Sequence, residues 1–344
     1  MIMKKVVFVC HDPGGFDVIQ PVYEALKKEN ITCEFFPVGP SKRMAGYGVD
    51  EAELLHILKN MLTNNEVCML VTGTSWGTDI EVKCLEMCSF VGVKTVSILD
   101  YWSNYRMRFK YMDYEKYVFP DKLFVMDEIA YEEAIADGID KSILEITGSP
   151  GLDKLVGMKD KIRKNEADRN GDILFLSDPL SDLYGDSLGY TEESVLEDVL
   201  AISKQLGRDV KVKFHPKDND RMRRKYAHLE VTGNIDDILP DYKIVISMVT
   251  MGLMHAYLLG VPIVSYQPGL IGKDMCITNI LGITTRVDCK NSLKKLLEND
   301  SFYRGRDKKM IWEDGKSVTR VCTRLHSLLG LFHENCKGEM SDEV

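Results

Sequence analysis

The chain has 344 residues, of which 44% are hydrophobic and 28% charged, and its formal net charge is −9. This length suits about two domains, and the negative charge disfavours non-specific binding to nucleic acid or to an anionic membrane. No stretch approaches the roughly 18 apolar residues of an integral membrane segment, and the opening residues MIMKKVVFVCHDPGG lack the long apolar region of a signal peptide.

Short apolar runs alternate with amphipathic segments along the chain. This alternation predicts parallel β–α–β units, and uninterrupted apolar runs are typical of strands covered on both faces. The predicted strands are residues 6–10, 32–37, 67–72, 94–98, 122–125, 144–146, 173–176, 210–214, 244–247 and 262–266. The predicted helices are residues 18–28, 52–64, 79–91, 130–137, 192–206, 252–259, 293–297 and 317–329.

A polar, charged stretch at residues 158–172 has no core periodicity and interrupts this pattern. We therefore predict two tandem, doubly wound Rossmann-like α/β domains, residues 1–157 and 173–335, joined by that linker and followed by a flexible tail at 336–344. Ligands of open parallel sheets bind beyond the carboxyl ends of the strands, so an inter-domain cleft is the expected site.

The nine cysteines form no paired framework. An odd number of cysteines in a long chain favours reduced thiols and a cytoplasmic protein. Cys84 and Cys88 lie four residues apart on a predicted helix and could face one metal ion. No CxxC or HxxxH motif accompanies them, so we favour packing and expect no metal site.

The loop CHDPGGFD follows the first predicted strand. Gly14 and Gly15 allow a tight turn and a close approach of the backbone to a ligand. His11 and Asp12 lie at the carboxyl end of the strand, which is where a ligand is expected. The loop matches neither the dinucleotide fingerprint nor the P-loop. The alternative is a tight turn with a capping aspartate.

The segment TGTSWGTDIEVKCLE follows the third predicted strand. Thr74 and Ser75 offer hydroxyl groups, and Asp79 precedes the next helix, so these three residues could line the cleft. Acidic residues at this place, including Glu81, are also expected for capping and for the helix dipole alone. The sequence leaves both alternatives open.

The stretch LDYWSNYRMRF combines aromatic rings with polar groups after the fourth predicted strand. Asp100, Trp102 and Asn104 provide a flat apolar face and directional hydrogen-bonding groups, which sugars and bases need. Arg108 could recognise an anion. We predict ligand binding here. An inter-domain or homodimer surface is the alternative.

In the second predicted domain, Ser177 ends the first strand and a long loop follows that could cover a ligand. In VKVKFHPKDND, Lys213 and His215 share one parity on a strand, and Pro216 ends it. A lysine beside a strand-end histidine suits a phosphate. A structural histidine is the alternative.

The segment VISMVTMGLMHAYLLGVPIVSY reads as strand, turn, helix and strand. Ser247, Thr250 and Gly252 fall where the helix begins, and hydroxyls with free amides at such a place bind phosphate. His255 lies one turn further and could face the same pocket. An ordinary Ser or Thr cap would look similar.

In combination, these motifs resemble bacterial glycosyltransferases of the GT-B fold, especially polysialyltransferase-type and CDP-glycerol polymerase-type enzymes. Lys213, His215 and Pro216 match their K-x-H-P motif, and Ser247 and Thr250 fall where those families hold the donor phosphate. The resemblance implies transfer of a sugar or polyol-phosphate unit from a nucleotide-activated donor to a glycan or lipid-linked acceptor. It implies surface polysaccharide or glycoconjugate synthesis with no required cofactor, and a His215 that stabilises the departing phosphate.

Three points stay open. Those families place an acid before alanine where this chain has His255–Ala256, so the donor nucleotide is undefined. Asp12, Asp79 and Asp100 are equal candidates for the base. The fold is also similar to non-hydrolysing UDP-N-acetylglucosamine 2-epimerases, which rank second because their arginine-bearing first loop and H-x-E-A-G-x-R segment are missing here. A non-catalytic nucleotide-sugar binding protein is the third alternative.

Overall fold

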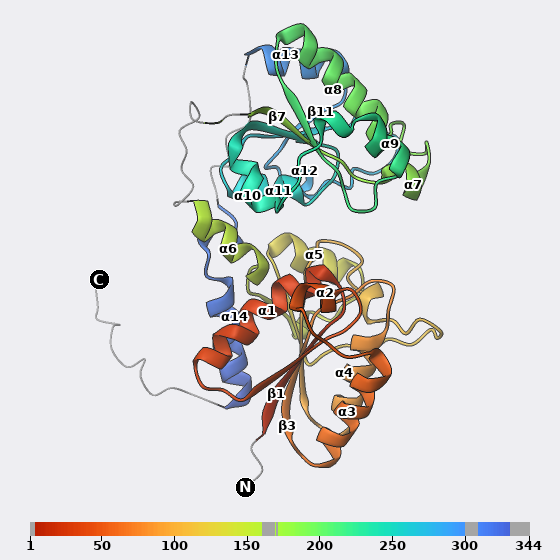
Figure 1. The fold of residues 1–344 in the computed structure, drawn as a ribbon. Helices are drawn as coiled ribbons and strands as arrows, with labels where there is room; N and C mark the ends of the chain where they lie inside the picture. The colour runs from red at the N-terminus through yellow and green to blue at the C-terminus, as the bar shows by residue number, and fades with distance from the viewer. Residues whose placement is uncertain (1–3, 160–168, 170, 300–308, 331–344) are drawn as a thin grey trace, which may run out of the picture. The chain divides into compact units, whose positions relative to one another are not determined.

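The computed structural model describes residues 4–159, 169, 171–299 and 309–330. The chain divides into two compact units, each with its own parallel sheet (Figure 1). Unit 1 comprises Met1–Lys154 and Met310–Val344, and unit 2 comprises Leu155–Lys309. Two Rossmann-like α/β domains in tandem confirm the predicted fold class.

The sheet of unit 1 has six parallel strands in the order β2-β1-β3-β4-β5-β6. These strands are β1 (Lys5–Cys10), β2 (Cys33–Pro37), β3 (Val67–Thr72), β4 (Lys94–Ile98), β5 (Lys122–Val125) and β6 (Leu144–Ile146). The chain reverses direction across the sheet between β1 and β3. The carboxyl ends of β1, β3 and β4 are therefore neighbours, and their loops can meet.

Helices cover both faces of this sheet. They are α1 (Pro13–Lys28), α2 (Ser41–Ala45), α3 (Glu51–Thr63), α4 (Ile80–Phe90), α5 (Glu128–Ala136) and α14 (Ser317–Leu329), with 3-10 turns at η1 (Met107–Phe109), η2 (Lys141–Ile143) and η6 (Ile311–Asp314). Helices α1 and α14 pack together on one face, and α3 and α4 on the other (Figure 1). Helix α6 (Pro150–Lys159) contains the boundary between the units.

The sheet of unit 2 has five parallel strands in the order β11-β10-β9-β7-β8. These strands are β7 (Gly171–Leu176), β8 (Val210–Lys213), β9 (Tyr242–Ser247), β10 (Ile263–Tyr266) and β11 (Thr285–Val287). The helices are α7 (Leu180–Tyr184), α8 (Glu192–Leu206), α9 (Asp220–Lys225), α10 (Ile235–Ile238), α11 (Gly252–Leu258), α12 (Ile277–Ile280) and α13 (Lys290–Asn299), with 3-10 turns at η4 (Ala227–Leu229) and η5 (Leu239–Asp241). Here α8 packs with α13, and α10 with α11 (Figure 1).

Helix α14 belongs to unit 1, although the sequence analysis assigned it to the second domain. Val321 and Leu325 on its apolar face are buried in the core of unit 1. The carboxylate of Asp153 accepts the Ser317 and Val318 backbone N–H groups at the start of the helix, at 3.1 and 2.8 Å. An apolar stripe shows that a helix needs cover, but not which sheet provides it.

Other boundaries differ by less. Helix α1 begins at Pro13 rather than at residue 18, and β8 ends at Lys213, before Phe214. Strand β11 and helix α6 were not predicted, and α6 covers the first residues of the predicted linker 158–172. Residues 160–168 and 170 of that linker, and the whole predicted tail, lie outside the described residues. In the described part of the chain, no helix combines the length and the apolarity that a membrane crossing requires.

Candidate functional site

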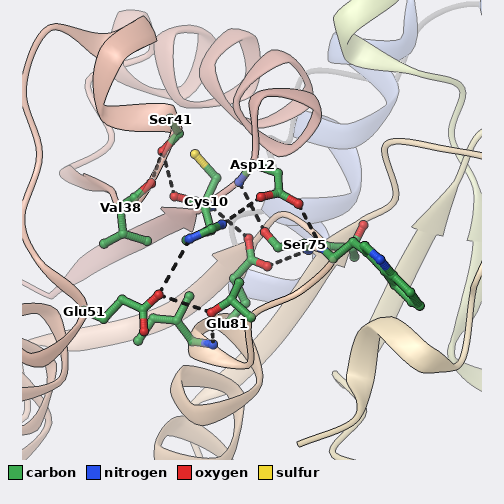
Figure 2. Close-up of polar contacts among 12 residues, drawn as sticks. Cys10, Asp12, Val38, Ser41, Glu51, Ser75 and Glu81 are labelled. Atoms are coloured by element: carbon green, nitrogen blue, oxygen red, sulfur yellow. Dashed lines mark hydrogen bonds and ion pairs between the residues drawn. The ribbon is translucent and has the colours of Figure 1, made fainter. Parts of the chain in front are cut away.

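The loops after β1, β3 and β4 of unit 1 bring together a group of charged side chains, called here the unit 1 cluster: His11, Asp12, Glu81, Asp100 and Arg108. Ser41 fixes the frame around it, because its hydroxyl bonds to the Cys10 and Val38 carbonyl oxygens at the ends of β1 and β2 (Figure 2). These side chains lie at the edge of the sheet where β1, β3 and β4 end.

Asp12 is held in place by both of its carboxylate oxygens. Its Oδ1 lies 2.7 Å from Nδ1 of His11, and its Oδ2 accepts the Trp76 backbone N–H at 2.8 Å. Burial opposes ionisation, but these two contacts prevail and hold the pKa of Asp12 below its usual range. The hydrogen bond to Asp12 likewise raises the pKa of His11, against the effect of burial. At neutral pH Asp12 is an anion, which suits hydrogen-bond acceptance better than proton uptake.

Glu81 lies inside the cluster, although the sequence suggested only a helix-start acid. Its two oxygens accept backbone N–H groups from His11 at 3.3 Å and from Ser75 at 2.7 Å (Figure 2). Burial raises the pKa of Glu81 to about 7, against the hydrogen bonds from Ser75 and with help from the charges of Asp12 and Asp100. Glu81 therefore holds a proton for part of the time at neutral pH, and it ties the loops after β1 and β3 together.

Replacing Glu81 by glutamine is expected to change how stability depends on pH. The pKa of Glu81 rises on folding from 4.5 to about 7, so its contribution is fully present below pH 4.5 and is lost as pH rises to about 7. A shift of this size corresponds to about 3 kcal/mol. Glutamine does not ionise, so the stability of E81Q should not change with pH at this site. In thermal unfolding, the melting temperature of E81Q relative to wild type should therefore be higher at pH 8 than at pH 5.

The control for this experiment is Glu53→Gln, an exposed acid on α3. Its melting temperature relative to wild type should be the same at both pH values. If E81Q behaves like this control, Glu81 is not protonated in the folded protein.

Asp100 has the most asymmetric environment in the cluster. Its Oδ1 accepts the Thr74 hydroxyl at 3.0 Å and Nη1 of Arg108 at 2.6 Å. Its Oδ2 receives no hydrogen bond from the described residues, and it faces Gly14 so closely that a Cβ on that glycine would lie 2.1 Å away. Arg108 also bonds to the Thr74 carbonyl and, through Nε, to the Ser103 carbonyl at 3.1 Å. Oδ1 of Asp100 is thus fixed by two hydrogen bonds, whereas Oδ2 lies against the backbone of Gly14, which has no side chain.

Three other predicted residues of unit 1 lie elsewhere. Asp79 is buried and bonded to Lys83 and to the Met112 N–H, at 2.6 and 3.2 Å. The indole N–H of Trp102 donates to Asp127 at 2.9 Å. Its ring is buried, so the predicted ligand-facing role of Trp102 is wrong. Asn104 is exposed in a left-handed turn (φ 56°), and within the described residues its side-chain amide bonds only to the neighbouring Ser103 hydroxyl, at 3.5 Å.

In unit 2, Asp178 connects the end of β7 with the loop after β9. It accepts hydrogen bonds from the Val249 N–H and the Thr250 hydroxyl, and burial nevertheless raises its pKa to about 7. Ser247 is fully buried and donates to the Leu176 carbonyl at 2.7 Å, with Asp178 at 3.4 Å. Ser247 has no hydrogen left for a phosphate. This part of the predicted phosphate site is wrong, because the hydroxyls hold the loop together.

His215 and Lys213 do not act as the predicted pair. The ammonium of Lys213 donates to the Gly233 carbonyl at 2.9 Å. Nδ1 of His215 accepts the Lys217 N–H at 3.1 Å, and burial lowers the pKa of His215. A neutral imidazole that accepts at Nδ1 carries its proton on Nε2. His215 is therefore a fixed hydrogen-bond donor at the carboxyl end of β8.

The remaining candidates of unit 2 lie at the same edge of its sheet. Nδ1 of His255 lies 2.6 Å from a carboxylate oxygen of Asp236, which is buried. A Cβ on Gly252 would lie 2.5 Å from the end of the Leu176 side chain, so the helix start packs closely against that side chain. Ser177 and Asp218 are both buried, and burial raises the pKa of Asp218.

Four functional candidates escaped the sequence analysis: Glu81, Asp178, Asp218 and Asp236. Each is buried and next to a turn or a helix start, where an acid is ordinarily read as a cap. The available signal for Asp178 was its place directly after a strand. Among the described residues, no group of three or more His, Cys, Asp or Glu could hold a metal ion, and Cys84 and Cys88 are both buried.

Comparisons with known proteins bear on the fold. No family model matches the sequence, and no curated protein matches it. A UDP-GlcNAc 2-epimerase from Methanocaldococcus jannaschii has a similar structure, with a TM-score of 0.67 at 12% identity over 94% of this chain and 99% of that chain. The enzyme of the same kind from Neisseria meningitidis, bound to UDP-GlcNAc, gives 0.68 at 12% identity over 94% and 100%. A putative one from Listeria monocytogenes gives 0.67 at 16% over 96% and 98%.

At these identities the likeness establishes the fold. The epimerases match this chain over nearly the whole length of both proteins. This finding contradicts the glycosyltransferase prediction and supports the alternative that had been ranked second.

Proposed function

We propose that this chain is an enzyme that inverts the configuration of one carbon in the sugar of a nucleotide sugar, as a 2-epimerase does. Unit 1 provides the proton-transferring groups, and unit 2 binds the nucleotide. The observation that carries the proposal is Asp100, whose Oδ1 is fixed by Arg108 and Thr74 while Oδ2 has no donor among the described residues.

Inversion at the carbon beside the anomeric carbon requires its C–H bond to break on one face and to form again on the other. The proton goes to a base, and the electron pair of the C–H bond forms a double bond to the anomeric carbon as the nucleotide diphosphate leaves with the C–O electron pair. Protonation from the opposite face and re-addition of the diphosphate then restore both bonds. A base must therefore be oriented toward the carbon, and a proton donor must be near. Asp100 fits the base because its carboxylate cannot rotate without breaking its contacts to Arg108 and Thr74. Glu81, with a pKa of about 7, holds a proton for part of the time at neutral pH, and the pKa of His11 in the same cluster is raised by its hydrogen bond to Asp12.

The negative charge of the loop after β1 favours binding of the sugar, rather than of the diphosphate, at the unit 1 cluster. Asp12 occupies a loop for which the epimerase resemblance calls for an arginine, and Glu81 and Asp100 add carboxylates beside it. Arg108 is already paired with Asp100 at 2.6 Å. A diphosphate would be repelled here, whereas sugar hydroxyls can donate to carboxylates.

Unit 2 has the groups that suit a nucleotide diphosphate. His215 offers a fixed Nε2–H, and no described residue forms an ion pair with Lys217, which follows it in the same loop. Positive charge that is local to this edge of β8 could bind an anion in spite of the negative net charge of the chain.

Incubation with UDP-GlcNAc alone tests the proposal. We expect a second nucleotide sugar that differs in configuration at one carbon, seen by NMR, with no acceptor added. Thermal shifts with UDP, CDP and GDP sugars should identify the nucleotide, since a ligand at a hundredfold excess over its Kd stabilises by about 3 kcal/mol. Binding without turnover of any of these sugars would instead support the non-catalytic binding protein.

A further inference from the structure

Trp76 is the one tryptophan of the chain with an exposed ring. The sequence contains three tryptophans. Trp102 and Trp312 are 4% and 0% exposed and pack edge to face, with ring centroids 6.2 Å apart. Trp76 is 55% exposed. Tryptophan combines a large apolar ring with a polar N–H, and it is enriched at binding surfaces.

The backbone that carries this ring is fixed by the unit 1 cluster. The Trp76 N–H donates to Oδ2 of Asp12 at 2.8 Å, and the preceding Ser75 N–H donates to Glu81 at 2.7 Å. The Ser75 hydroxyl accepts the Asp12 N–H at 3.3 Å, and Gly77 turns the chain with a φ of 84°. Two carboxylates thus fix the backbone that carries the exposed indole.

From this geometry we infer that Trp76 is a stacking surface for a pyranose ring, with Asp12 accepting hydrogen bonds from the hydroxyls of the same sugar. A sugar presents a flat C–H face and a rim of hydroxyl donors, so it needs an apolar plane and adjacent anionic acceptors. The indole and Asp12 provide both, from two loops that the hydrogen bond between the Trp76 N–H and Asp12 joins. The inference rests on the proposed function, because it assigns the sugar of the nucleotide sugar to this surface.

Acrylamide quenching of tryptophan fluorescence tests the inference in the whole protein. Acrylamide is neutral, so the carboxylates do not repel it, and it reaches Trp76 while the two buried rings are shielded. UDP-GlcNAc should reduce the quenching, and UDP alone should leave it unchanged. Equal effects of UDP and UDP-GlcNAc, or a thermal shift by UDP-GlcNAc without protection of Trp76, would overturn the inference and leave the proposed function standing.

If none of the UDP, CDP and GDP sugars causes a thermal shift, the proposed function fails, and free N-acetylglucosamine then decides about Trp76. Protection by the free sugar would support the stacking surface, and no protection would overturn it. Quenching that weakens as the protein concentration rises without ligand would also overturn it, because a second copy of the chain would then cover the ring.

Two variants measure the contribution of the Trp76 ring to binding. Trp76→Ala should weaken UDP-GlcNAc binding roughly tenfold, equivalent to about 1.4 kcal/mol, and leave the affinity for UDP unchanged. The matched control is Phe90→Ala, which removes another exposed aromatic ring, 90% exposed, at the far end of α4. Phe90→Ala should change neither affinity. Equal effects of the two variants would contradict a specific role of Trp76.

Discussion

Changing Asp100 to asparagine is expected to lower kcat for a nucleotide sugar about a hundredfold or more, within the range for loss of a general base. Asparagine keeps an oxygen that can accept the Thr74 hydroxyl and Nη1 of Arg108. It cannot take up a proton. The Kd for UDP, measured by calorimetry, should stay within about twofold of wild type, because the nucleotide is assigned to unit 2.

The matched control is Asp79→Asn, in the same unit. Asp79 is also a buried carboxylate, directly before α4, but both of its oxygens have partners, Lys83 and the Met112 N–H. This variant should lose stability and keep its kcat. D100N should also lose stability, by about 3 kcal/mol, because the buried Arg108 loses its counter-charge. A D100N enzyme with nearly wild-type kcat would exclude Asp100 as the base.

Changing Gly14 to alanine is expected to displace the Asp100 carboxylate without changing Asp100 itself. The new Cβ would lie 2.1 Å from Oδ2 of Asp100, which is far inside contact distance. Asp100 could move only by giving up its bonds to Arg108 and Thr74. We expect kcat to fall roughly a hundredfold, since small misplacements of a reacting group have effects of that order.

The matched control is Gly15→Ala, which makes the same change at the next residue. Its added Cβ would meet the Cys10 Cβ at 3.5 Å and the Gly73 Cα at 3.6 Å, which are ordinary contacts. Gly15→Ala should therefore keep its activity, and it should gain up to about 1 kcal/mol of stability because alanine favours a helix over glycine. Equal loss in both variants would show that the helix start, and not Asp100, is sensitive.

Much of the fold could be predicted from the sequence because its strands are short apolar runs with polar ends. The bounds of β3, β4, β5 and β6 match the prediction, as do those of α8. What local patterns do not contain is the partner of each element. The amphipathic face of α14 is evident in the sequence, but its assignment to unit 1 depends on long-range packing.

The sequence was enough to predict which loops carry the candidate site. It was not enough to predict the role of each residue in those loops. Placing Asp12 and Asp100 at strand ends was enough to bring them into one cluster. The burial of each side chain determined its role. Trp102 and Trp76 are both tryptophans in loops after strands, yet one donates to Asp127 in the core and the other stays exposed. No local signal separates these two outcomes.

The phosphate site of unit 2 was misread for a related reason. A serine after a strand and a threonine before a helix are compatible with a ligand site or with an internal network. Asp178 decides between them, because its buried carboxylate bonds to the Thr250 hydroxyl and lies near Ser247. That acid lies about 70 residues earlier in the chain, so sequence spacing gives no indication of the contact.

Incubation of the wild-type protein with UDP-GlcNAc in D2O is the most direct test of the central claim. If the unit 1 cluster moves a proton at a ring carbon, NMR will show deuterium at one carbon of the sugar together with the second epimer, and D100N will show neither. Recovery of undeuterated UDP-GlcNAc alone, from a wild-type protein that demonstrably binds it, would contradict the proposed epimerase.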